Sequence, residues 1–195
     1  MTDQEVIDRF KKTGALLEGH FVLSSGLHSC VYLQCAIALQ STRDAIDFGS
    51  ALAEHFKDHQ IETVASPAIG GIVIGYEVAR QLGVRFIWTE RENGRMTLRR
   101  GFTVSVHERI LVVEDVITTG GSTRDTIAAL QAWGADVIAA GSIIDRSGGQ
   151  VDVGVPRASL ATLNISAVSP DECDACMRGE PVVKPGSRRT VSSKQ

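Results

Sequence analysis

Hydrophobic and polar positions along the chain follow two periods, one typical of helices and one typical of strands. Apolar residues recur at helical spacing in 3–13, 42–59, 72–82 and 123–133. Short apolar runs at 62–66, 85–89, 109–114 and 136–145 indicate strands. Two short extended pieces are expected within 19–34, around a Ser-Ser-Gly turn. Strands and helices alternate, which predicts an α/β fold with a mainly parallel, twisted sheet flanked by helices.

The strand expected at 109–114 leads into the most informative segment of the chain. Its apolar residues do not alternate with polar ones, so we expect it to be buried on both faces. It ends in Glu114 and Asp115, and a Thr/Gly/Ser loop and a helix follow. Glycines let backbone N–H groups converge on an anion, and a helix N-terminus, here expected to be capped by Ser122 or Thr123, adds partial positive charge. This order predicts a sugar-phosphate site in which the acids face sugar hydroxyls or Mg²⁺.

An ordinary Gly-rich turn after a buried strand is the alternative, and the paired acids at the strand end weigh against it. Two other phosphate-binding motifs are excluded. No Gly-Lys-Ser/Thr follows the loop, so it is not a Walker loop, and GxGxxG, the dinucleotide fingerprint, is absent.

Ligands of parallel sheets bind beyond the carboxyl ends of the strands. The loops after Ser66, Thr89, Glu114 and Ile144 are therefore expected to surround one cavity. The loop at 67–71 (PAIGG) has no side-chain donors, so it would bind a diphosphate through backbone N–H groups or serve only as a tight turn.

Cationic groups near this cavity must be arginines, because the chain has no lysine between Lys57 and Lys184. The segment 90–100 (ERENGRMTLRR) is the most basic stretch. It predicts either a solvated β-hairpin or a polar loop that folds over a bound ligand and excludes water. Arg146, at the end of the strand 136–145, has a planar guanidinium suited to pairing with a carboxylate.

Composition limits the class of protein. The chain has 195 residues, 43% hydrophobic and 22% charged, with a formal net charge of −3, which fits a globular protein of one domain and gives no sign of nucleic-acid binding. No apolar run approaches the roughly 20 residues that cross a membrane. The N-terminus lacks the apolar region of a signal peptide, so a cytoplasmic location is expected.

The four cysteines are Cys30, Cys35, Cys173 and Cys176. Without an export signal we expect them to be reduced and free of metal. Cys173 and Cys176 form a CxxC, half of a zinc site, which would be complete if Cys30 and Cys35 met it in space. No residue is assigned to a metal, and His20 and His28 are expected to be hydrogen-bonded structural residues.

The segment VVEDVITTGGST resembles the phosphoribosyl-diphosphate (PRPP) motif of type I phosphoribosyltransferases. GHFVLSSGLHS and CDACMRGEPVVKPGSR resemble one branch of bacterial and archaeal orotate phosphoribosyltransferases, so the resemblance spans nearly the whole chain. It implies the type I phosphoribosyltransferase fold as a single domain over 1–195. The core would cover about 42–166, a small hood about 1–40 and 167–186, and a loose tail 187–195.

The resemblance also implies an activity. The 5-phosphoribosyl group of PRPP would pass to orotate, giving orotidine 5′-monophosphate and diphosphate, in de novo pyrimidine biosynthesis. Mg²⁺ would be bound mainly through PRPP, and a homodimer would share its active sites. A phosphoribosyltransferase for another base, such as a purine or xanthine, and a PRPP-binding regulator without turnover are the alternatives.

Site residues follow from the resemblance position by position. PRPP would be bound by Glu114, Asp115, Val116, Ile117, Thr118, Thr119, Gly120, Gly121 and Ser122. Diphosphate would be bound by Ala68, Ile69, Gly70 and Gly71, and orotate by Thr118 and Arg146. The catalytic residues would be Asp115 with Arg91 and Arg95, the latter two on a mobile loop at 90–100 that serves the partner subunit. That loop carries lysines and a histidine in well-known members of the family and only arginines here, and Ser24 stands where the better-known branch has a lysine.

Overall fold

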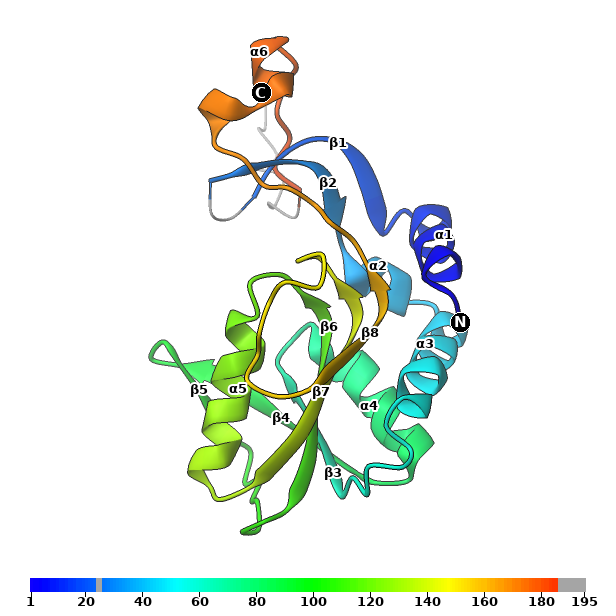
Figure 1. Ribbon diagram of the computed structural model, residues 1–195, viewed down its shortest axis with the longest axis vertical. Coiled ribbons are helices and arrows are strands. Elements are labelled where there is room, and N and C mark those ends of the chain that lie inside the picture. The colour runs from blue at the N-terminus through cyan, green and yellow to red at the C-terminus, as the bar shows by residue number, and fades with distance from the viewer. Residues whose placement is uncertain (24–25, 186–195) are drawn as a thin grey trace, which may run out of the picture. The chain divides into compact units, whose positions relative to one another are not determined.

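The computed structural model describes residues 1–23 and 26–185, in two compact units (Figure 1). The larger unit comprises Met1–Ala15 and Gln34–Asn164. The smaller one comprises the described residues of Leu16–Leu33 and of the chain from Ile165 to Pro185. Residues 1–15 and 34–40, expected in the hood, thus group with the larger unit. Ser24 and the tail expected at 187–195 lie outside the described residues.

A six-stranded sheet forms the centre of the larger unit, in the order β5-β4-β3-β6-β7-β8. The strands are β3 (Thr63–Pro67), β4 (Arg85–Glu92), β5 (Arg95–Leu98), β6 (Arg109–Ile117), β7 (Asp136–Asp145) and β8 (Arg157–Thr162). Neighbouring strands are parallel except for β4 and β5. The prediction of a mainly parallel sheet is confirmed.

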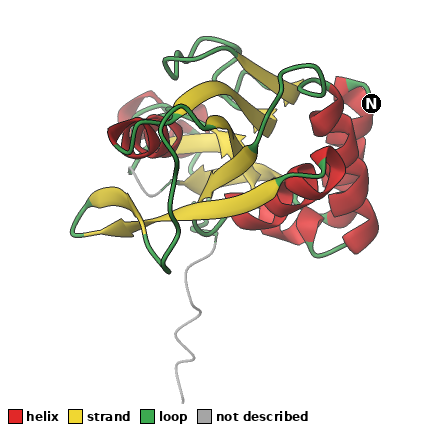
Figure 2. Ribbon diagram, turned by 90° about the horizontal axis from the view of Figure 1, so that it is seen from below, coloured by secondary structure: helices red, strands yellow, loops and turns green. Residues whose placement is uncertain are grey.

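Helices cover both faces of this sheet (Figures 1 and 2). They are α1 (Asp3–Thr13), α2 (Cys35–Leu39), α3 (Thr42–Glu54), α4 (Gly71–Leu82) and α5 (Gly121–Ala132). α3 and α4 pack together on one face, where a Cβ at Gly49 would lie only 2.6 Å from the Cβ of Glu77. Helix α5 lies on the other face (Figure 1), where Ile127 and Leu130 join a core with Ala65 and Val112. The α/β fold class is confirmed.

Strand β6 is the most buried element of the sheet, as its continuous apolar run predicts. Ile110, Leu111, Val112 and Val113 are all 0% exposed, so both faces of the strand lie in the core. The strand continues past the acids to Ile117, three residues further than predicted, because β7 pairs with it along this length.

The segment 90–100 forms a β-hairpin instead of an irregular polar connection. Strand β4 extends to Glu92, turns through Asn93 and Gly94, and pairs with β5. Both turn residues have positive φ, as a two-residue hairpin turn requires. Of the two possibilities that the sequence left open, the hairpin is the local structure. Strand β8 and helix α2 were not predicted.

The smaller unit is built on an antiparallel pair, β1 (Leu16–Val22) and β2 (His28–Leu33), which confirms the two extended pieces. Its C-terminal part contains the 3₁₀-helix η1 (Pro170–Glu172) and the short helix α6 (Asp174–Met177). Backbone hydrogen bonds join that part to the strands, with Val168 bonded to His28 and Val183 bonded to His20 and Val22.

None of the helices in the described part of the chain is long and apolar enough to span a membrane.

Candidate functional site

Two acidic side chains lie at the carboxyl end of β6, the central strand of the larger unit. Thr123, in the first turn of α5, donates a hydrogen bond from its hydroxyl to Glu114. The thiol of Cys35, the first residue of α2, hydrogen-bonds to Asp115. Each acid is therefore held by a side chain from a different helix.

Burial of these acids makes their negative charge costly. Burial raises the pKa of Glu114 to about 7, the nearby charge of Asp115 adds to this, and the Thr123 hydrogen bond opposes it. Burial also raises the pKa of Asp115, and burial together with Asp115 raises the pKa of the Cys35 thiol. None of these causes supplies a positive charge, so the end of β6 favours a ligand that brings hydroxyl groups or a cation.

The loop between β6 and α5 is shaped by Gly120. Its φ of +71° is left-handed, and a Cβ there would lie 2.6 Å from Cγ1 of Val151, so both conformation and space require glycine. Arg124 braces the loop by donating from Nη2 to the carbonyl of Thr119 and from Nη1 to the carbonyl of Asp152.

The expectation that Ser122 or Thr123 caps the helix is wrong. Helix α5 begins at Gly121 with Gly120 as its N-cap, and no side chain caps it. Ser122 and Thr123 lie in the first turn, since the left-handed glycine turns the chain two residues earlier than the pattern indicated. The first N–H groups of a helix have no partners within the helix, so this end is suited to binding an anion.

The loop at 68–70 joins β3 to α4 and closely approaches the end of β6. A Cβ at Gly70 would lie 2.7 Å from Oδ1 of Asp115, and one at Gly71 would lie 2.9 Å from the carbonyl oxygen of Val113. The peptide bond between Ala68 and Ile69 is cis. Two segments that are about 45 residues apart in the sequence are thus in contact, and only glycine leaves room for this.

Arg146 lies beside the loop that follows β6. Its backbone N–H donates to the carbonyl of Ile117, which precedes Thr118. Asp145, one residue earlier, is buried and is held by Ser147 and by Nη1 of Arg157 at 2.6 Å. Burial alone would raise the pKa of Asp145, but these hydrogen bonds and the ion pair lower it. The two expected orotate contacts, Thr118 and Arg146, therefore start from neighbouring backbone positions.

The hairpin and the residues that follow it bring arginines next to the loop at 68–70. Ala68, Ile69, Arg91 and Arg100 are among the residues that line a cavity of about 510 Å³. Arg91 is also paired with Asp125 of α5 at 2.8 Å, and Arg100 is paired with Glu90 at 2.7 Å. Arg95 lies exposed at the start of β5, opposite Glu92.

Arg100 lines the same cavity, although it was not among the predicted site residues. The sequence does show the Arg99-Arg100 pair at the end of the basic segment. It does not show which of these arginines lies near residues 68–69, because that depends on how the segment folds back.

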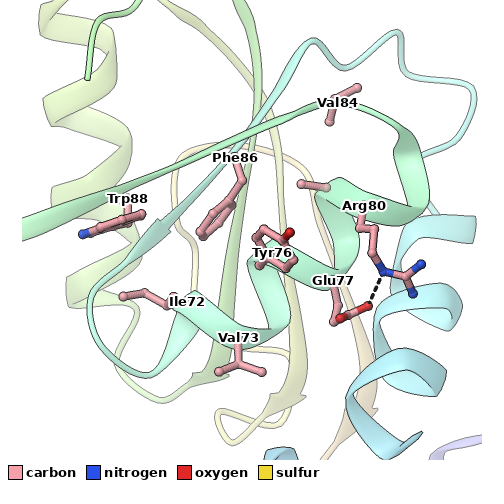
Figure 3. Close-up of a pocket in the computed structure, with 9 residues that line it drawn as sticks. Ile72, Val73, Tyr76, Glu77, Arg80, Val84, Phe86 and Trp88 are labelled. Atoms are coloured by element: carbon pink, nitrogen blue, oxygen red, sulfur yellow. Dashed lines mark hydrogen bonds and ion pairs between the residues drawn. The ribbon is translucent and has the colours of Figure 1, made fainter. Parts of the chain in front are cut away.

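A second cavity, of about 530 Å³, lies between α4 and β4 and is mostly apolar (Figure 3). Its lining consists of Ile72, Val73, Tyr76, Glu77, Ala79, Arg80, Val84, Phe86 and Trp88. Figure 3 shows the ring of Tyr76 beside that of Phe86, with Glu77 and Arg80 paired at one side. None of the expected site residues lines this groove, although Ile72 and Trp88 also border the cavity with the arginines.

Solved structures define the class to which this fold and site belong. Orotate phosphoribosyltransferase from Aeropyrum pernix superposes with a TM-score of 0.65 at 30% identity, covering 81% of this chain and 93% of that one. Adenine phosphoribosyltransferase from Thermoanaerobacter pseudethanolicus superposes with a TM-score of 0.59 at 16% identity, covering 68% and 88%, which shows the fold alone. The chain has the fold of the type I phosphoribosyltransferases.

Proteins of similar sequence identify the family within this class. The orotate phosphoribosyltransferase of Caldicellulosiruptor bescii is 53% identical over 189 residues, which are 97% of this chain and all of that protein. That of Thermotoga maritima is 51% identical over 178 residues, 91% of this chain and 95% of the other. No family model matches the chain. The chain belongs to the orotate phosphoribosyltransferase family, as its motifs indicated, and is a transferase.

The raised pKa of Glu114 predicts a pH dependence of stability. The folded protein holds a proton on Glu114 that the unfolded chain loses near the ordinary glutamate pKa of 4.5. The contribution of this proton to stability is therefore complete below about pH 4.5 and is lost as the pH rises to about 7. The free energy of unfolding of the ligand-free protein should fall by about 1–3 kcal/mol over this window, at about 1.4 kcal/mol per unit and allowing for partial exposure. Urea unfolding at several pH values measures it.

Glu114→Gln should remove most of this fall, while Glu54→Gln, which changes an exposed glutamate of α3, should retain it. An unchanged slope in Glu114→Gln would show that Glu114 titrates normally.

Proposed function

We propose that this chain transfers the 5-phosphoribosyl group of PRPP to orotate, giving orotidine 5′-monophosphate and diphosphate. One observation carries the proposal for the site: the Gly70–Gly71 backbone lies directly against Asp115 and Val113 of β6, and the uncapped start of α5 follows the same strand. Backbone donors for two phosphate groups thus flank a pair of acids suited to a sugar. Close relatives are named for this reaction.

The residues from Glu114 to Ser122 would hold the phosphoribosyl group. The N–H groups at the start of α5, with the hydroxyls of Thr118, Thr119 and Ser122, would donate to the 5-phosphate. Glu114 and Asp115 would accept hydrogen bonds from the ribose hydroxyls, which are neutral and so tolerate neighbouring buried carboxylates. Val116 and Ile117 would contribute as the last residues of β6, the strand that positions the two acids and the start of α5.

The donor set at the end of β6 fits Mg²⁺ brought in by PRPP. Glu114 and Asp115 offer only carboxylate oxygens, the ligand type that Mg²⁺ prefers, and their raised pKa values indicate a place that lacks positive charge. Mg²⁺ bound mainly through PRPP would supply charge neutralisation for the departing diphosphate.

Departure of diphosphate would be assisted by backbone donors and arginines. Ala68, Ile69, Gly70 and Gly71 would bind it through the main chain. Arg91, which borders the same cavity as Ala68 and Ile69, would leave Asp125 to pair with it, and Arg95 would join when the hairpin moves. The anomeric carbon becomes oxocarbenium-like as the bond breaks, so positioning and exclusion of water do most of the catalysis.

Orotate carries a carboxylate, and Arg146 is the group proposed to recognise it. Thr118, beside it, would hydrogen-bond the ring. A purine offers no carboxylate to this arginine, which disfavours the alternative base. A regulator without turnover is disfavoured by identity of about 50% to named transferases over nearly the full length.

A role in de novo pyrimidine biosynthesis follows from this reaction, and we place it in the cytoplasm. The described cysteines are all free, which agrees with a reducing compartment.

The left-handed glycine gives the first test of the PRPP site. Gly120→Ala should raise the KM for PRPP by at least about 100-fold, since a Cβ would collide with Val151 and shift the N–H groups that bind the phosphate. Steady-state kinetics with orotate held constant measure it.

Gly83→Ala is the matched control. Gly83 has a φ of +70° at the end of α4, and a Cβ there meets nothing within 4 Å, so this variant carries the same backbone strain away from the site. If the KM for PRPP changes equally in both variants, backbone strain alone explains the effect. That result would contradict the assignment of the loop around Gly120 to the 5-phosphate.

Arg146→Ala tests the base site. We expect consumption of orotate with Mg²⁺ and PRPP by the wild-type protein and no consumption of hypoxanthine. In Arg146→Ala the KM for orotate should rise by about 100-fold or more, because a charge-assisted pair is lost, while the KM for PRPP changes little. Arg43→Ala, on the exposed side of α3, should leave both constants unchanged. Equal orotate KM values in wild type and Arg146→Ala would refute the assignment.

We also propose that a second copy of the chain covers the apolar groove between α4 and β4. Val73 and Tyr76 are 45% and 57% exposed there, so apolar side chains of α4 lie at the surface where a second copy would bury them. The groove shares Ile72 and Trp88 with the cavity that contains Arg91 and Arg100, so a copy docked on it would reach the arginine side of the site. This supports a homodimer with shared active sites.

Light scattering coupled to size exclusion tests the dimer. The wild-type protein should elute with the mass of two chains, and Val73→Asp should shift it toward one, since a buried charge without a partner opposes association. Val106→Asp is the control, because Val106 is 70% exposed outside the groove. A monomeric wild type, or a Val73→Asp variant as dimeric as the control, would contradict the proposal.

A further inference from the structure

Four potential metal ligands converge in the smaller unit. They are His20 of β1, His28 of β2, Cys173 and Cys176, each offering one atom, and these atoms all lie within 4.8 Å of one another. His20, His28 and Cys173 are buried, and Cys176 is partly buried. The cluster joins residues about 150 positions apart in the sequence.

The distances within the cluster match a tetrahedral metal site. Nε2 of His20 and Nδ1 of His28 are 2.9 Å apart, and Sγ of Cys176 lies 3.2 Å from the latter and 3.6 Å from the former. Sγ of Cys173 lies 3.5 Å from Nε2 of His20. Bond lengths of about 2.0–2.3 Å in a tetrahedral zinc site put two nitrogens about 3.3 Å apart and a nitrogen and a sulfur about 3.6 Å apart. The four distances thus lie within about 0.4 Å of the tetrahedral values, and all four atoms lie within 4.8 Å of one another.

The orientation of the His20 ring is set by a hydrogen bond outside the cluster. Its Nδ1 lies 3.0 Å from the carbonyl oxygen of Glu180. A carbonyl only accepts, so Nδ1 donates this hydrogen bond, and Nε2 on the other side of the ring faces the sulfurs and His28. A backbone carbonyl that orients the far side of a ligating imidazole is typical of metal sites.

The surroundings give a cation access to this cluster. The cluster borders an open cavity of about 530 Å³. Four carboxylates line it, from Glu18, Glu172, Asp174 and Glu180, against one arginine, Arg178. The excess of negative charge favours entry of a cation.

The smaller unit also needs a stabilising cross-link. It consists of two paired strands and short helical turns, and an isolated two-stranded sheet is marginal in water. Its buried hydrophobic residues are few among those described: Leu16, Phe21, Leu33 and Cys173. A metal that ties β1 and β2 to the CxxC turn would replace the missing core, as in other small metal-bound folds.

We propose that His20, His28, Cys173 and Cys176 form a structural Zn²⁺ site. Four protein ligands fill a tetrahedral shell and leave no position for substrate, so the metal holds the fold and does no chemistry. Binding converts both thiols to thiolates and releases their two protons to solvent. The CxxC is therefore completed by two histidines and not by Cys30, which is exposed, or Cys35, whose thiol is bonded to Asp115.

Metal analysis of the purified full-length chain tests the site. We expect about one zinc per chain as isolated under reducing conditions. After zinc is removed with a chelator, Co²⁺ alone should give the intense visible bands of a tetrahedral complex and a near-ultraviolet thiolate charge-transfer band, and Zn²⁺ should abolish both.

Cys173→Ser and Cys176→Ser should each weaken metal binding by more than about 100-fold, since even changes outside the ligand shell cost about 10–100-fold. Cys30→Ser, which removes an exposed thiol from the same unit, should bind one metal like the wild type. Should the Cys173 or Cys176 variants fail to fold, the Co²⁺ spectrum of the wild-type protein decides alone.

Three results would overturn the proposal: a reduced wild-type protein that binds neither metal, a Co²⁺ spectrum of a six-coordinate site without thiolate bands, or a Cys173–Cys176 disulfide in the protein as isolated. The site shares no residue with the proposed catalytic machinery. A wild-type protein that binds no zinc but still transfers the phosphoribosyl group to orotate would thus refute this inference and leave the proposed function intact.

Discussion

The close approach of two glycines to the end of β6 is the constraint on which the rest of the candidate site depends. Gly70 and Gly71 bring a backbone loop against Asp115 and Val113, with no room for a Cβ at either position. Strand β6 is buried on both faces and paired on both edges, so it cannot move to relieve a clash. The rigid strand therefore determines where the loop at 68–70 and the acids meet.

That arrangement places groups that disfavour a negative charge beside groups that favour one. Glu114 and Asp115 are buried where a negative charge is unfavourable, while the uncapped start of α5, four residues after the end of the strand, attracts one. A ligand with a phosphate, neutral hydroxyls and an accompanying cation satisfies both. The fold alone does not choose the base, because adenine phosphoribosyltransferases share it. The base site must be argued from Arg146 and its neighbours.

Local patterns predicted the elements that carry the site. The apolar run before Glu114 indicated a doubly buried strand, and the glycines after it indicated a loop that binds an anion. The predicted bounds of strands were wrong where pairing with another strand sets the end of the element. Strand β6 extends to Ile117 because β7 pairs with it, and β4 extends to Glu92 because β5 folds back on it. The helix begins at Gly121 because a left-handed glycine, and not a hydroxyl, stands before it.

The cysteines show most clearly the difference between what the sequence determines and what the tertiary structure decides. The sequence by itself determined the sheet, the acids, the glycine loops and a CxxC, since each depends on residues close along the chain. Only the tertiary structure brings His20 and His28 together with that CxxC, from about 150 positions away in the sequence, while Cys30 and Cys35 stay outside the cluster. It also places Arg91 and Arg100 on the same cavity as Ala68 and Ile69. The physical reason is that contacts between distant segments are set by packing and pairing, which no local spacing encodes.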